Sequence, residues 1–149
     1  MGSRREHILE ELRTRLKVIR TAAGYATDAG ETVFMGEAPE LGPDDPPQAI
    51  AIVVEDETPD HVAENVHSLL PVTIAALAKA NLEEPWMTAE AVLADIKRAV
   101  ELADRTLGGA VRLRMERGIT RTMQREAGSE TVGIAIQYRC PIVEKWGDP

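Results

Sequence analysis

The sequence has few aromatic residues, and this shortage limits what the protein can do. Aromatic residues make up 3% of its 149 positions, so the core must be built from Val, Ile, Leu, Ala and Met side chains. The aromatic residues are Tyr25, Phe34, Trp86, Tyr138 and Trp146. Proteins that bind single-stranded nucleic acids without sequence preference stack the bases on exposed aromatic side chains. The composition therefore argues against that role.

Cysteine and long apolar runs are also scarce. Cys140 is the only cysteine, so no internal disulfide can form and a cysteine-based zinc site is excluded. No apolar run follows Met1–Arg5, and none approaches the roughly 20 residues that span a membrane. We therefore expect a cytosolic protein with no secretory signal and no membrane contact.

Lysine and arginine are missing between Glu31 and Leu70, in a chain whose net charge is −8. The acidic residues of this stretch are Glu31, Glu37, Glu40, Asp44, Asp45, Glu55, Asp56, Glu57, Asp60 and Glu64. From Val111 onward, arginine and lysine together outnumber Asp and Glu. The two segments form either two ordinary solvated faces or two complementary surfaces that dock against a partner or another copy.

The stretch from Leu69 to Gly109 predicts the centre of a single domain spanning residues 1–149. Alternating apolar residues from Leu70 to Ala78 predict a buried strand, with Pro71 at its start or on an edge. Residues 75–78 also suit a helix. A firm helix follows, with Thr88 as its N-cap and Gly108–Gly109 at its end. Its buried stripe is Val92, Leu93, Ile96, Val100 and Ala103, with Asp95, Lys97, Arg98 and Glu101 facing outward.

Helical spacing of apolar residues predicts a first helix from Arg4 to Ala23, stopped by Gly24. Short strands are predicted at 32–36 and 48–54, separated by an acidic, proline-rich loop at 37–47 that we expect to be exposed. An acidic turn at 55–60 then leads into a strand that begins at His61 and continues through Leu70. The chain ends, 1–3 and 143–149, are expected to be flexible.

Three alternating segments follow the central helix. Residues 111–115 predict a half-buried strand that Gly118 breaks or bulges. Residues 119–125 predict an edge strand or projecting arm, and residues 131–140 predict the clearest strand of the chain, ended by Pro141. The last two segments form a hairpin around a turn at 126–130. We detect no internal repeat.

Three residue groups resemble chemical sites, and each has a simpler explanation. His61, Glu64 and His67 with Asp60 could hold a metal on a helix, but their spacing fits no zinc motif. Cys140 ends a strand on its buried face and suits core packing better than nucleophilic chemistry. Gly108–Gly109 follows a helix, whereas glycine-rich phosphate loops precede one. We expect no enzyme, cofactor or metal.

The order and spacing of these elements resemble the tail-terminator proteins of long-tailed bacteriophages, the family of the lambda minor tail protein U. The likeness spans most of residues 4–142. The segments that carry it are 70–74, 88–91, 94–99, 104–109, 126–130 and 132–138. Arg139–Ile142 departs from the uninterrupted, aromatic-bearing strand that the family pattern leads us to expect. The family pattern therefore does not define the residue at which the last strand ends.

The resemblance implies an α+β protomer whose mixed, mostly antiparallel sheet carries two helices on one face and a projecting β-hairpin. It also implies a hexameric ring at the tail–neck junction of a virion, assembled in the host cytoplasm. Such a ring caps the tail tube, stops its polymerisation and meets the head connector, with DNA passing through the lumen without specific binding. The partners would be the tail tube protein, the connector or stopper protein, and further copies of the chain.

Two sets of residues are candidates for the surfaces of such a ring. Asp44, Asp45, Glu55, Asp56 and Glu57 could line the lumen, where they would repel DNA phosphates. Arg112, Arg114, Arg121 and Arg125 could meet a neighbouring subunit or the tube. The strand at 119–125 could extend a neighbour's sheet.

Two alternatives remain for the function. One is a head-completion or stopper ring of the phage neck, and the other is an adaptor or ligand-binding domain unrelated to phage.

Overall fold

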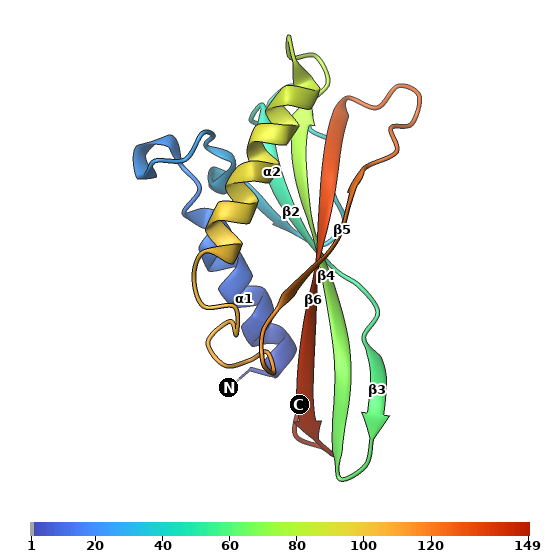
Figure 1. The fold of residues 1–149 in the computed structure, drawn as a ribbon. Helices are drawn as coiled ribbons and strands as arrows, with labels where there is room; N and C mark the ends of the chain where they lie inside the picture. The colour runs from blue at the N-terminus through green and yellow to red at the C-terminus, as the bar shows by residue number, and fades with distance from the viewer. Residues whose placement is uncertain (1) are drawn as a thin grey trace.

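A six-stranded sheet forms the centre of the protein, and two helices cover one of its faces (Figure 1). The computed structural model describes residues 2–149. The helices are α1 (Arg4–Lys17) and α2 (Pro85–Glu101). The strands are β1 (Val33–Met35), β2 (Gln48–Val54), β3 (Thr58–Val62), β4 (Asn65–Lys79), β5 (Glu116–Thr122) and β6 (Thr131–Lys145). The predicted α+β class, with helices on one face, is confirmed.

The sheet is mostly antiparallel, with the order β1-β2-β4-β6-β5 and β3 paired to β4 beside this path. β1 and β2 are parallel, and the other pairs are antiparallel. β4 and β6 pair along their whole lengths, from Asn65↔Lys145 to Lys79↔Thr131. These two long strands lie next to each other in the middle of the sheet. β5 pairs with β6 on its other side, which is the predicted hairpin.

Two prolines lie inside the long strands, where a proline normally removes a ladder hydrogen bond. The Pro71 carbonyl accepts from Glu55 N–H at 3.0 Å, just beyond the last residue of β2. The Pro141 carbonyl accepts from Arg112 N–H at 2.7 Å, just beyond the level at which β5 begins. Each proline therefore faces a side on which the neighbouring strand has ended. The prediction that Pro141 ends the last strand is wrong, as is the placement of Pro71 at a strand start.

The helical face of the sheet holds the main core. Alternate residues of β4 and β6 point toward the helices, and Val72, Ile74, Ile136 and Tyr138 are almost fully buried there. The predicted stripe of α2 is buried from Val92 to Val100, whereas Ala103 lies beyond the helix and is exposed. This layer is mostly aliphatic, so the protein buries a core with few aromatic residues.

The opposite face has a second, smaller cluster beneath the acidic proline-rich loop. Leu41 is 1% exposed and packs with Ala49, Ala51, Ala75 and Leu77. Its N–H donates to the Thr131 hydroxyl at 2.7 Å. The loop that we expected to be exposed is therefore anchored on the sheet by one leucine.

Both helices end earlier than predicted, because tertiary contacts replace their last turns. α1 stops at Lys17, and the Ile19 carbonyl accepts from Gly30 N–H at 2.9 Å. A Cβ at Gly30 would collide with the Leu16 carbonyl, so glycine lets this segment close over the helix end. Gly24 ends a short 3₁₀ turn (Thr21–Ala23) with a φ of 92°.

Helix α2 begins at Pro85, with Glu84 as its N-cap, and not after Thr88. It ends at Glu101, well before Gly108–Gly109, which lie in a separate loop. Proline suits the first turn because that turn needs no N–H donor.

Other differences concern the chain around the strands. Residues 111–115 form no strand, and Leu113 has a left-handed φ of 63°. The predicted acidic turn at 55–60 runs into β3, and the chain reverses after Val62 before β4 begins. β6 includes residues 143–145 of the terminal segment that we expected to be flexible. The register of β5 shifts between Arg117 and Thr120, so the break or bulge expected at Gly118 lies inside β5 and not at the end of a strand at 111–115.

Candidate functional site

The structure places each of the three residue groups that resemble chemical sites in the sequence. His61 and His67 face each other across β3 and β4 with ring centroids 5.5 Å apart, and no group of three metal-ligating side chains occurs among residues 2–149. Cys140 is fully buried, and this burial raises the pKa of its thiol to about 12. A protonated, enclosed thiol is a packing residue and not a nucleophile.

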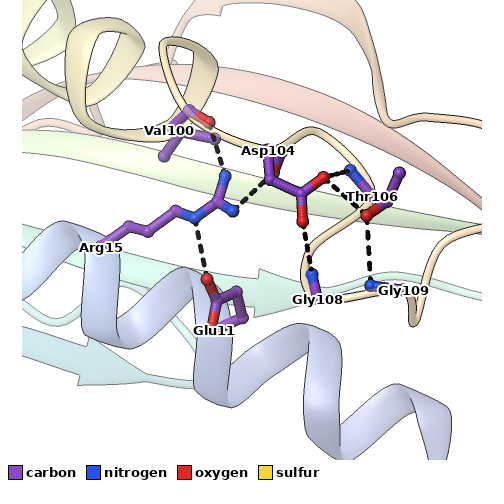
Figure 2. Close-up of polar contacts among 7 residues, drawn as sticks. All are labelled: Glu11, Arg15, Val100, Asp104, Thr106, Gly108 and Gly109. Carbon is purple, nitrogen blue, oxygen red and sulfur yellow. Dashed lines mark hydrogen bonds and ion pairs between the residues drawn. The ribbon is translucent and has the colours of Figure 1, made fainter.

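Gly108 and Gly109 belong to a loop that is organised by Asp104 (Figure 2). The Asp104 carboxylate accepts from Thr106 Oγ1 at 2.6 Å, from Thr106 N–H at 2.8 Å and from Gly108 N–H at 3.1 Å. These bonds hold the pKa of Asp104 below its ordinary value, and the bond from the Thr106 hydroxyl has the largest effect. The amides of this loop are turned inward onto protein groups, so neither a phosphate loop nor a helix cap describes it.

Arg15 joins α1 to the end of α2 next to this loop (Figure 2). Its guanidinium donates to the Val100 carbonyl at 3.0 Å, to the Asp104 carbonyl and to Glu11 Oε1 at 3.1 Å. The pairs Glu11–Arg15 and Glu10–Arg13 lie along α1. Arg15 satisfies the Val100 carbonyl at the C-terminus of α2 and the Asp104 carbonyl just beyond the helix, and it therefore has a structural role.

Three of the candidate lumen residues lie in the segment that joins β2 to β3. Glu55 accepts from Thr73 Oγ1 at 2.6 Å and from Gln137 Nε2 at 2.8 Å. Glu57 forms an ion pair with Arg5 at 3.0 Å. Asp56 is exposed between them. Two of these three acids are thus bound within the protomer.

The other two candidate lumen residues lie in the proline-rich loop. Asp45 accepts from Gly42 N–H at 2.7 Å and stabilises the turn, whereas Asp44 is exposed. Of the candidate lumen residues, Asp44 and Asp56 are therefore the ones whose charge is free to face solvent.

The four candidate arginines are all exposed, but they do not form one patch. Arg121 shares a hollow on the helix-free face with Glu55 and Gln137. Arg114 lines a second hollow on that face, at the level of Leu69 and Pro141. Arg125 donates to the Ser129 carbonyl at the far end of the β5–β6 hairpin. Arg112 extends from the loop whose backbone contacts β6.

The edge strand β5 is fixed to the core by Glu101 of α2. Glu101 accepts from Tyr138 Oη at 2.7 Å and pairs with Arg117 of β5 through both of its oxygens. Burial raises the pKa of Glu101, but the bonds from Arg117 and Tyr138 outweigh it and the pKa is lowered overall. Within residues 2–149, β5 is last in the sheet order and pairs with β6, so its other edge is open.

Two features escaped the sequence patterns. Asp95 was predicted to face outward, yet it is fully buried and accepts from Ala26 N–H, Thr27 N–H and Thr27 Oγ1. Asp95 lies on the same side of α2 as the buried Val92 and Ala99, and this position in the sequence could have predicted its burial. Trp146 lies beyond the predicted strands, is 66% exposed, and donates to the Ala63 carbonyl at 2.8 Å.

No helix among residues 2–149 has the length and apolar character that crossing a membrane requires.

Comparison with known proteins gives a likeness in fold and none in sequence. No family model matches the chain, and no curated protein matches it. Among solved structures, a chain from the virion of a native gene transfer agent (GTA) particle matches with a TM-score of 0.61. The match covers 89% of this chain and 91% of that chain at 15% identity. At this identity the likeness establishes a shared fold.

Proposed function

We propose that the protein is a structural component of a phage-type virion and forms the ring that caps the tail tube. In this role it ends polymerisation of the tube and joins the tail to the head connector. The observation that carries the proposal is the fold likeness to a virion chain over about nine-tenths of both chains. The order of elements, which resembles the tail-terminator family, supports the finer assignment.

The proposed ring works by shape and not by catalysis. A ring of identical subunits uses a heterologous contact, in which one surface meets a different surface on the neighbour. The open edge of β5 is one such surface, because an exposed strand can add to a neighbour's sheet. Arg117 and Tyr138 hold this edge against Glu101 of the protomer, so the strand is presented in a fixed position.

The lumen of the proposed ring carries acidic residues. Asp44 and Asp56 are exposed and free of the internal bonds that occupy Asp45, Glu55 and Glu57. Negative side chains repel DNA phosphates and let the duplex slide without sticking. A ring structure with Asp44 and Asp56 on its outer rim would rule out this part of the proposal.

Electron microscopy of particles that lack the protein tests the function directly. Loss of a tail terminator yields tails that are too long, because nothing stops the tube. Full heads and separate tails of normal length would instead indicate a stopper ring on the head side. Normal particles would overturn both assignments. Mass photometry with isolated tail tubes tests the ring itself, since a hexamer weighs six times the 16.3 kDa of one chain.

A further inference from the structure

We infer that Trp146 is the anchor of a contact between two copies of this chain, and that it docks into the arginine-rimmed hollow beside Leu113. The contact would be one part of the heterologous joint of the proposed ring, in addition to the open edge of β5, so the inference rests on the proposed function. It joins two sites that lie on different parts of the protomer: a tip at the end of β6 and a hollow on the helix-free face of the sheet.

The tip combines exposed apolar side chains with a rigid support. Trp146 is 66% exposed and Val62 is 53% exposed. The Trp146 indole N–H donates to the Ala63 carbonyl at 2.8 Å, and Lys145 is paired with Asn65 of β4. Figure 1 shows this end of β4 and β6, with β3, reaching below the helices. A tryptophan held in place before binding loses little conformational freedom when it docks.

The surroundings of the tip are acidic. Asp60 and Glu64 lie on the β3–β4 hairpin, and Glu144 and Asp148 flank the tryptophan in the sequence. Lys145 is the one lysine or arginine between residues 140 and 149. A complementary site would therefore combine an apolar floor with positive charge at its rim.

The hollow has this complementary character on balance, because its lining holds two arginines and one glutamate. It has a volume of about 600 Å³ and is lined by Leu69, Leu113, Arg114, Glu116, Arg139 and Pro141. Leu113 is 76% exposed and has a left-handed φ of 63°. An exposed leucine in this conformation gains nothing from burial within the protomer and costs backbone strain. Such a residue suits a surface that becomes covered on assembly.

The tip that we propose for the hollow comes from another molecule. Trp146 follows Pro141 by five residues, and most of this distance is β6 paired to β4. An extended strand advances by about 3.3 Å per residue, so a protomer's own tip is held well away from its own hollow. A second copy would bring its acidic tip to this hollow, whose lining includes Arg114 and Arg139. Guanidinium groups bind favourably to the face of an indole ring.

Sedimentation velocity of the full chain, at increasing concentration, tests the contact. We expect wild-type protein to self-associate. The Trp146→Ala variant should need at least about tenfold more protein to reach the same average mass, because loss of a tryptophan at the centre of an interface weakens binding by this much. Trp86→Ala is the matched control, because Trp86 is also exposed, at 40%, but lies at the other end of the sheet. It should associate like wild type.

Leu113→Gly separates assembly from folding. Glycine adopts the left-handed φ without strain, so this variant should melt no lower than wild type while losing the association. An equimolar mixture of Val62→Cys and Leu113→Cys chains should form a disulfide-linked pair under mild oxidation. Neither chain should form that pair alone, because each carries half of the joint.

Three outcomes would overturn the inference. Wild-type chain could stay monomeric up to millimolar concentration, Trp146→Ala could associate as wild type does, or Trp146→Ala rings could form normally and fail to bind tubes. The last result would assign the tip to a different partner. None of these results decides the proposed function, because tail length in particles lacking the protein is measured independently.

Discussion

Arg15 donates a hydrogen bond to the carbonyl of Val100 at 3.0 Å, although 85 residues separate the two in the chain (Figure 2). This bond lies at the C-terminus of α2, which ends at Glu101 and does not continue to Gly108–Gly109. The last carbonyls of a helix need partners, and Arg15 supplies one from α1 to the Val100 carbonyl. The two helices are therefore joined at the point where the C-terminal third of the chain begins.

Replacing Arg15 with methionine should destabilise the protein while keeping much of the side-chain volume. The variant loses the bonds to the Val100 and Asp104 carbonyls and leaves both unpaired. The Arg15 side chain is 10% exposed, so little water reaches this site to replace the lost bonds. We expect the free energy of unfolding to fall by roughly 2–3 kcal/mol. Urea denaturation of Arg15→Met and wild type measures this, and Arg13→Met, on the exposed side of α1, is the control. Equal midpoints for Arg15→Met and wild type would contradict the structural role.

Replacing Asp95 with asparagine should also lower stability, by roughly 1–3 kcal/mol. Both carboxylate oxygens of Asp95 accept bonds from the backbone of Ala26 and Thr27. An amide NH₂ group would point a donor at one of these donors, in a fully buried position. Calorimetric melting of Asp95→Asn measures the loss, with Glu90→Gln on the exposed side of α2 as the control. A variant that melts with wild type would show that the segment at 26–27 does not depend on this carboxylate.

The periodicity of apolar residues predicted most of the fold. The stripes of α1 and α2, the buried strand at 48–54 and the hairpin of β5 and β6 follow from local patterns that the packing reinforces. Element ends were predicted less well, because they depend on distant residues. Gly30 closes α1 and Arg15 closes α2, and neither contact has a local signal.

Two prolines misled the strand predictions for a related reason. A proline breaks a strand only where its missing N–H would have met a neighbour, and at Pro71 and Pro141 the neighbouring strand has already ended. Which strands lie beside a proline is a property of the whole sheet. The candidate site had the same limitation, since the charge pattern identified Glu55 and Arg121 but could not place them in one hollow.

Acid should weaken the attachment of β5 through Glu101. The pKa of Glu101 is lowered in the folded protein, because the bonds from Arg117 and Tyr138 outweigh the effect of burial. A carboxylate with a lowered folded pKa contributes stability above its unfolded pKa and loses it as the pH falls through the folded value. The unfolded value is about 4.5, so the loss begins below that pH.

The variant Glu101→Gln isolates this effect. It should be less stable than wild type at pH 7, and the difference should shrink between pH 4.5 and pH 3 as the wild-type carboxylate takes up a proton. Urea midpoints at pH 7, 4.5 and 3 give the comparison. Tyr138→Phe, which removes one of the bonds to Glu101, should show a smaller pH dependence than Glu101→Gln. A difference between wild type and Glu101→Gln that is constant with pH would refute the assignment.

The open edge of β5 can be blocked without disturbing its pairing to β6. The Met123 N–H donates to the Gly133 carbonyl at 2.9 Å. In an antiparallel strand, the backbone amides of alternate residues point toward the same neighbouring strand. The amide of Thr122 therefore points to the open side, where a proline removes a donor that the protomer does not use. Thr122→Pro should melt close to wild type but form fewer rings on tail tubes if a neighbour adds to this edge. Mass photometry counts the rings, and Thr122→Ala controls for loss of the side chain. Normal ring formation by Thr122→Pro would exclude β5 as an intersubunit strand and leave the joint between subunits to side-chain contacts.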